Sequence, residues 1–260
     1  MLDLNIDSIK DFQTCERLYD FRHVDNLPEK IYSREIYTKK FENTVKNIIF
    51  YFWYKKQAGM TPSYSSLLNR WEKLWFPKDM DSYSIITEQH ESAYGNISSL
   101  TTKAASLLLN FYDSYSEASI IPIGIDEFYA CTFDKKIKVQ DKIDLIYRLD
   151  GKNYVVKLFF NFRNKNSYLY QIDFAFMYES FRNKHPHKID DTRFGYIDLL
   201  SSNIQFEEYK PSIEDIDSLE YWCNSIYEKE IFVPKRGMIP YCKTCPFDQP
   251  CKKWNGWNNG

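Results

Sequence analysis

The chain has 260 residues, enough for one large hydrophobic core. Hydrophobic residues make up 43% and charged residues 27% of it, a composition typical of a folded protein and not of a disordered one. The net charge of −2 excludes a strongly basic nucleic-acid binder, so any basic surface has to be local. The sequence contains no membrane-spanning apolar stretch and opens without a signal peptide, which predicts an intracellular protein that contacts no membrane.

The opening segment predicts a short helix. It begins at the capping residue Asp7 and spaces Ile9, Phe12 and Cys15 three apart, so we expect Cys15 on the buried face of that helix. An amphipathic helix is predicted over 41–56, because its apolar residues recur on one stripe. These residues are Phe41, Val45, Ile48, Ile49 and Phe52.

Helical periodicity continues to residue 115, and strands follow. Gly59 and Pro62 end the first long helix, and further helices are predicted over 65–75 and 91–115. From residue 120 onward the sequence contains runs of β-branched and aromatic residues, which are typical of strands. The predicted strands are 120–133, 137–149, 154–162, 194–200 and 204–209, with helices over 168–182 and 212–228. The first three strands, joined by the turn Asp150-Gly151, predict a meander in an α/β core.

A cysteine cluster near the C-terminus indicates a metal site. Cys242, Cys245 and Cys251 stand among three prolines, which predicts a rigid loop and not a helix or strand. Together with Cys15 they supply four thiolates, which suit either a tetrahedral zinc ion or an iron–sulfur cluster. A disulfide or unpaired buried thiols are the alternatives, and a reducing compartment disfavours the disulfide.

These motifs resemble the iron–sulfur branch of the PD-(D/E)XK nucleases, the RecB-like superfamily that includes the CRISPR-associated exonucleases and the AddB subunit. The likeness rests on the N-terminal stretch Ser8 to Phe21, which contains Cys15, and on Phe232-Val-Pro234 before the cysteine triplet. It implies a restriction-endonuclease-like α/β core, a mixed sheet flanked by helices, with an N-terminal helical lobe. It also implies that Cys15, Cys242, Cys245 and Cys251 hold a [4Fe-4S] cluster that joins the chain ends; zinc is the alternative cofactor.

On this resemblance the chain is one RecB-like domain over 1–260. A helical insertion lobe is expected over 35–118, the sheet core over 119–210, and the closing helix with the cysteine clasp over 211–254. The remaining cysteines, Cys131 and Cys223, are predicted to be core thiols.

The expected nuclease centre departs from the resemblance. Asp144 occupies the position of a metal-binding aspartate, but Lys157 and Phe159 stand where the next strand should carry a carboxylate and a lysine. Divalent-metal catalysis needs carboxylates to hold the ion and a lysine to stabilise charge. We therefore interpret Asp144 as an ion-paired strand residue that Lys157 neutralises.

Other positions of the expected nuclease centre match the family pattern only in part. Glu127 matches an acidic position of the family and Gln171 its glutamine, whereas Ala175 replaces a common tyrosine. Lys46 lies closest to the place of the family's histidine. Residual metal binding by Asp144 and Glu127 remains an alternative.

The preferred hypothesis is a pseudo-nuclease that binds DNA, single-stranded or with free ends, or joins a protein partner in replication, recombination, repair or defence. One alternative is an active exonuclease dependent on Mg²⁺ or Mn²⁺, with Glu127, Asp144 and Lys157 at its centre. The other is a protein-binding scaffold without DNA contact. The basic-aromatic run 51–56 is interpreted as a helix face that covers the core.

Overall fold

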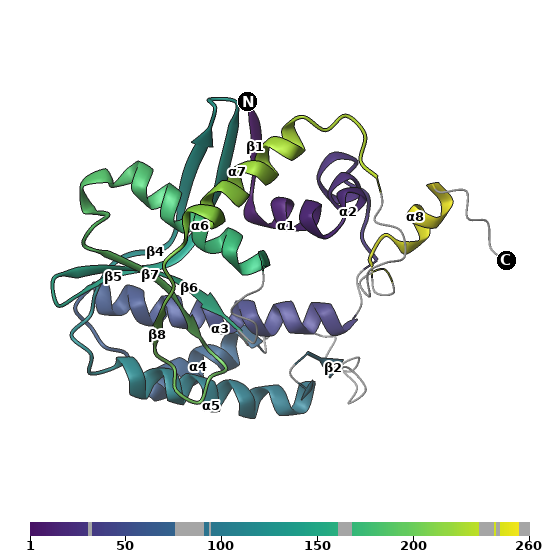
Figure 1. Ribbon diagram of the computed structural model, residues 1–260. Coiled ribbons are helices and arrows are strands. Elements are labelled where there is room, and N and C mark those ends of the chain that lie inside the picture. The colour runs from purple at the N-terminus through teal and green to yellow at the C-terminus, as the bar shows by residue number, and fades with distance from the viewer. Residues whose placement is uncertain are drawn as a thin grey trace.

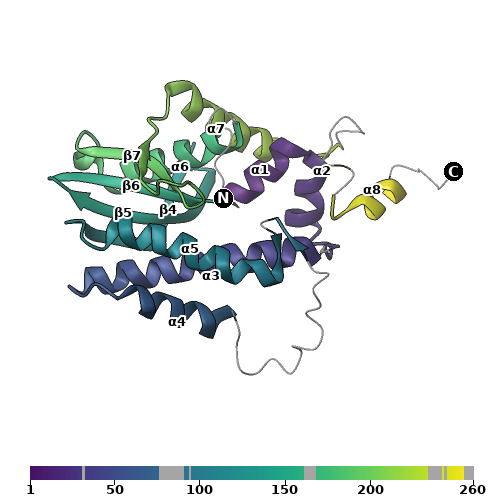
Figure 2. The same ribbon diagram turned by 90° about the horizontal axis from the view of Figure 1, so that it is seen from below.

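A mixed six-stranded sheet lies between two layers of helices in the computed structural model (Figures 1 and 2). The structure describes residues 1–30, 33–75, 91–93, 95–160, 168–233, 242 and 245–254. Its strands are β1 (Leu2–Leu4), β4 (Ile121–Phe133), β5 (Ile137–Leu149), β6 (Lys152–Phe159), β7 (Thr192–Asp198) and β8 (Phe206–Glu208). The α/β class and the mixed sheet predicted from the sequence are therefore confirmed.

The predicted meander forms the centre of the sheet. Strands β4, β5 and β6 pair antiparallel in succession, and β7 and β8 form the second predicted pair. Asp150 and Gly151 have φ values of 49° and 78°, the left-handed conformation that a two-residue type I′ hairpin requires at both positions. Strand β6 pairs parallel with β7, with helix α6 in the connection. The last positions of the third predicted strand, 161 and 162, lie outside the described residues.

One face of the sheet packs against α1 (Ile6–Thr14), α6 (Tyr168–Lys184) and α7 (Ile213–Tyr227). The closing helix α7 begins as predicted at Ser212, whose side chain caps the amide of Asp215 at 3.2 Å. The apolar residues of these helices and of the sheet form one core, which includes Phe12, Ile172 and Leu219.

The other face packs against α3 (Ser33–Gln57) and α5 (Ile97–Tyr115), and α4 (Tyr64–Trp75) packs against these two helices; Figure 2 shows all three beneath the sheet. The predicted stripe of α3 is confirmed, because all five of its apolar residues are fully buried. Trp53 of the same helix stacks on Tyr147 of β5 with ring centroids 6.2 Å apart. Each such side chain contributes about 1.5–3 kcal/mol through burial, so this layer is anchored firmly to the sheet.

The structure differs from the sequence prediction in three places. Helix α5 begins at Ile97, because Glu91–Ser92 (β2) and Gly95–Asn96 (β3) form a small antiparallel pair before it. Strand β1 was not predicted, and it pairs parallel with β5. A π-helix, Asp20–Val24, follows the short helix α2 (Glu16–Tyr19). Within the described residues, no helix combines the length and the apolar character needed to cross a membrane.

Candidate functional site

The candidate site lies where strand β5 exchanges partners. On one edge, β5 pairs with β1 up to Val139 and with β6 from Leu145 onward, so residues 140–144 lie between the two pairings. We name residues 140–144 the strand fork. Two carboxylates accept backbone N–H groups there: Asp141 Oδ2 from Ile6 at 3.2 Å and Asp144 Oδ2 from Leu158 at 2.7 Å. On this edge of β5, side chains of the fork, and not a neighbouring strand, accept the N–H groups of Ile6 and Leu158.

Asp144 is buried at this fork and forms an ion pair with a helix of the lower layer. Only 5% of the residue is exposed, and Lys46 Nζ of α3 lies 3.2 Å from its Oδ2. The sequence placed Lys46 at the family's histidine position but assigned Lys157 as the partner of Asp144. Within 4 Å, Asp144 pairs with Lys46, whereas Lys157 Nζ lies 3.8 Å from Asp173 Oδ1 of α6; Asp144 is nevertheless the carboxylate that raises the pKa of Lys157 most.

The carboxylates around the fork also determine the pKa of Lys157. Its position on β6 follows the Leu145–Val156 pair, so it comes opposite Asp144. Burial alone would lower the pKa of Lys157, but the surrounding carboxylates, led by Asp144 and Asp173, outweigh burial and raise the pKa. Lys157 therefore stays positively charged at neutral pH.

Asp173 is the residue that sequence reasoning missed. Its side chain is 2% exposed, and Lys10 Nζ of α1 lies 2.5 Å from its Oδ2. The sequence did contain an indication of this role, because Asp173 stands in α6 between the apolar residues Ile172 and Phe174, which are both buried. A buried carboxylate in such a place needs a cation or a hydrogen-bond donor beside it. The centre thus joins lysines from α1, α3 and β6 to two buried aspartates.

This arrangement places ammonium groups where a divalent ion would need open carboxylates. Phe159, two residues beyond Lys157, packs edge-on against Tyr170 and Tyr196 with ring centroids 5.0 and 6.1 Å away. Among the residues that the structure describes, no three His, Cys, Asp or Glu side chains are placed to hold a metal ion. The described centre is an internal ion-pair network beside an aromatic cluster.

Glu127 and Gln171 lie in other surroundings. The side chain of Glu127 is 45% exposed, and its carboxylate lies 3.8 Å from Lys184 at the end of α6. Gln171 lies near the hydroxyl of Tyr209, which donates to Asp215 at 3.1 Å. Glu127 is not among the acids that raise the pKa of Lys157, so the structure does not bring it to the fork.

The cysteine ligand candidates gather at one end of the molecule. Cys15, Cys245 and Cys251 pack against a small apolar cluster formed by Leu18, Phe21 and Phe247. Burial raises the pKa of the Cys245 thiol to about 11, and the thiols of the other three candidates, Cys242 included, add to this effect. The thiols of Cys15, Cys242 and Cys251 therefore lie within electrostatic reach of Cys245, although the described residues do not form a closed metal site.

Two predictions about these cysteines are wrong. Cys15 lies in extended backbone (φ −162°) at the junction of α1 and α2, and not on the buried face of a helix. Cys251 belongs to helix α8 (Asp248–Trp254) and not to a loop, because Pro250 falls in the first turn, where a helix tolerates proline. Most of the predicted loop before Cys245 lies outside the described residues. Cys131 and Cys223 are buried core thiols, as predicted.

Contacts between distant segments hold the two chain ends together near the cysteines. Glu16 of α2 accepts Lys229 Nζ at 3.0 Å and the backbone N–H of Val233 at 3.1 Å. The backbone N–H of Lys30 donates to the carbonyl of Pro246 at 3.3 Å. The thiols are thus brought together by contacts that do not involve them.

Comparison with known proteins yields distant likenesses only. No family model matches the chain, and no curated protein matches it. Among solved structures, a provisionally assigned exonuclease from Eubacterium rectale is 12% identical over 93% of this chain and 87% of that chain, with a TM-score of 0.49. SSO0001 is 11% identical over 95% of this chain and 84% of that chain, with a TM-score of 0.35. Likenesses this distant assign no family, activity or ligand to the chain.

Proposed function

We propose that the chain is a catalytically degenerate protein of the RecB-like nuclease fold. It binds nucleic acid, or serves as an assembly subunit, in a machine for DNA replication, recombination, repair or defence. The observation that carries this proposal is the strand fork, where Asp144 meets the ammonium group of Lys46 and stands opposite Lys157. A metal-dependent nuclease needs a second carboxylate at that place.

The charges around the fork explain why hydrolysis is not expected. Lysines 10, 46 and 157 neutralise the carboxylates that would otherwise attract Mg²⁺ or Mn²⁺. A cation approaching Asp144 has to displace a lysine already paired with it and then lacks further anionic ligands. On this proposal, the network stabilises the fold at the former catalytic place.

We further propose that Cys15, Cys242, Cys245 and Cys251 hold a [4Fe-4S] cluster. Their common neighbourhood supports this assignment, and four thiolates match the donor set of such a cluster. The cluster, when bound, supplies thiolate–iron bonds that link the N-terminal helices to the C-terminal segment. In this scheme residues 35–118 are a helical lobe inserted before the sheet core at 119–210, and residues 211–254 form the closing helix and clasp.

A cleavage and binding assay tests the function. Purified protein is mixed with end-labelled single-stranded DNA and Mn²⁺, and an Asp144→Ala variant serves as the matched control. We expect no cleavage by either protein, and binding that weakens as salt rises, because phosphate contacts release counterions. Cleavage that Asp144→Ala abolishes would establish the active exonuclease instead. Absence of any DNA binding would leave the protein-binding scaffold.

The cofactor has its own test. We expect brown protein containing iron and sulfide, and loss of its visible absorbance in a Cys245→Ser variant. Cys131→Ala is the matched control, since Cys131 is a buried thiol of the apolar core and should leave the absorbance unchanged. Colourless protein with one zinc per chain would overturn the iron–sulfur assignment.

A further inference from the structure

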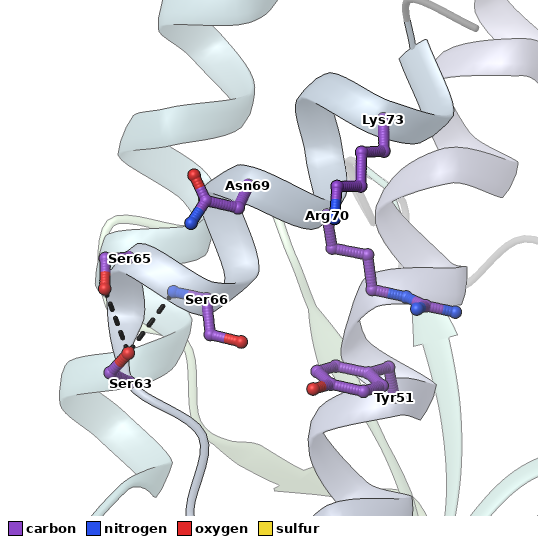
Figure 3. Close-up of a pocket in the computed structure, with 7 residues that line it drawn as sticks. All are labelled: Tyr51, Ser63, Ser65, Ser66, Asn69, Arg70 and Lys73. Atoms are coloured by element: carbon purple, nitrogen blue, oxygen red, sulfur yellow. Dashed lines mark hydrogen bonds between the residues drawn. The ribbon is translucent and has the colours of Figure 1, made fainter.

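A polar pocket opens between helix α3 and the start of helix α4, and no residue of the strand fork lines it (Figure 3). Its volume is about 400 Å³. The lining residues are Tyr51, Ser63, Ser65, Ser66, Asn69, Arg70 and Lys73. We name it the α3–α4 pocket. None of its lining residues is acidic, so its net charge is positive in a chain whose overall charge is −2.

Tyr51 holds one of the two cations that line the pocket, Arg70. The guanidinium carbon of Arg70 lies 4.5 Å from the centroid of the Tyr51 ring, and Figure 3 shows the Arg70 side chain extending over that ring. Lys55 Nζ lies 5.7 Å from the same centroid, and Lys73 follows Arg70 three residues along α4. Stacking on an aromatic ring restricts the guanidinium while leaving its N–H groups free to bind an anion.

In the part of the chain that the structure describes, no carboxylate lies in an ion pair with Arg70, Lys73 or Lys55. Arg70 and Lys73 are exposed, so both can reach a ligand without rearrangement. The pocket therefore offers positive charge that no described carboxylate pairs with.

Hydroxyl groups complete the lining. Ser63 Oγ accepts the backbone N–H of Ser66 at 3.3 Å and lies 3.0 Å from Ser65 Oγ, and these serines surround the N-terminus of α4 (Figure 3). The first turn of a helix adds partial positive charge. Serine hydroxyls, a helix start, an arginine and a lysine are together the donors that bind a phosphate group.

We propose that the α3–α4 pocket binds the phosphate of a nucleotide, either as a phosphodiester within a single strand or as the phosphate of a free nucleotide. A pocket of about 400 Å³ exceeds a phosphate alone and lies within the range of small-ligand sites, so sugar and base also fit. Arg70 and Lys73 bind the phosphate oxygens, and Tyr51 is a positioning residue that holds Arg70. The strand form rests on the proposed function, whereas the free-nucleotide form does not.

The test compares a double variant with a charge-matched control. Arg70→Gln with Lys73→Gln removes two cations of the pocket. Lys152→Gln with Lys210→Gln removes two exposed lysines that do not line it. Fluorescence anisotropy follows a labelled oligothymidylate, and calorimetry follows thymidine monophosphate. Circular dichroism verifies that both variants are folded.

We expect the pocket variant to bind at least tenfold more weakly than wild-type protein, while the control stays within twofold. If the strand occupies the pocket, the slope of log affinity against log salt falls by about 1.4, since each of two phosphate contacts contributes about 0.7. Tyr51→Leu should weaken binding, and Tyr51→Phe should retain it because the ring remains.

The outcomes are distinguishable. Strand binding that is weakened only by the pocket variant supports the phosphodiester form, and mononucleotide binding alone with the same loss supports the free nucleotide. Strand binding unchanged by the pocket variant overturns this inference and leaves the proposed function intact. Wild-type protein that binds neither probe overturns the inference and the nucleic-acid role together.

Discussion

Replacing Lys157 by glutamate tests the interpretation that the ion-pair network around Asp144 and Asp173 is a degenerate metal site. The substitution puts a second carboxylate opposite Asp144 and removes the cation that lies 3.8 Å from Asp173. In wild-type protein Mn²⁺ should have no effect on stability through this centre. In Lys157→Glu it should bind between residue 157 and Asp144, because paired carboxylates are the ligands that hard cations require.

The expected sizes follow from burial. Removing one partner of a buried ion pair costs about 3–5 kcal/mol. Asp173 keeps Lys10 at 2.5 Å, and Lys157 is 19% exposed, so a loss near 3 kcal/mol is expected without metal. Mn²⁺ at a hundredfold excess over its dissociation constant would raise the free energy of unfolding of the variant by about 2.7 kcal/mol. The variant should therefore regain nearly wild-type stability in Mn²⁺.

Urea unfolding, followed by tryptophan fluorescence with Mn²⁺ or with EDTA, measures these differences. Lys157→Gln is the matched control, because it loses the same cation without gaining a carboxylate and should not respond to Mn²⁺. Adding Asp144→Asn to Lys157→Glu should remove the response. Wild-type protein stabilised by Mn²⁺ in a manner that Asp144→Asn abolishes would refute the degenerate centre.

Three further outcomes test the fold and its electrostatics. Gly195→Ala should lower the free energy of unfolding by more than about 3 kcal/mol, because the new Cβ would lie 2.1 Å from the backbone oxygen of Glu207; the urea midpoint measures this. Burial raises the pKa of Glu179 in the folded protein, so the free energy of unfolding should rise as pH falls through that raised pKa toward 4.5. The Glu179→Gln variant should lack this rise, and urea titrations at a series of pH values measure it. Glu16→Gln should cost about 1 kcal/mol and speed hydrogen exchange at the amide of Val233; unchanged exchange would contradict the contact between the chain ends.

Local patterns predicted most of the helices and strands. The stripe from Phe41 to Phe52 and the alternating runs that became β4 to β6 carry their periods within one segment, so the sequence contains the whole signal. Strand β1, from Leu2 to Leu4, has no such signal, because three residues are too short for a period. It is a strand because of β5, which lies far along the chain.

The centre was predictable only in part for the same reason. Asp144 and Lys157 face each other across one hairpin, so the sequence could place both. Asp173 and Lys10 reach the centre only after α6 and α1 pack on the sheet, and their separation of 163 residues leaves no local pattern. Lys46 was placed near the centre, but its pairing with Asp144 depends on how α3 crosses the sheet.

The parallel pairing of β1 with β5 has a consequence for how the protein is made. The backbone N–H of Ile6, the first residue of α1, donates to the carboxylate of Asp141, a residue 135 positions later. At translation rates of roughly 5–20 residues per second, the first strand waits on the order of ten seconds before its partner leaves the ribosome. During that interval the apolar residues Ile9 and Phe12 have no sheet to cover them. We therefore expect the N-terminal segment to dock on the sheet only after β5 has been synthesised.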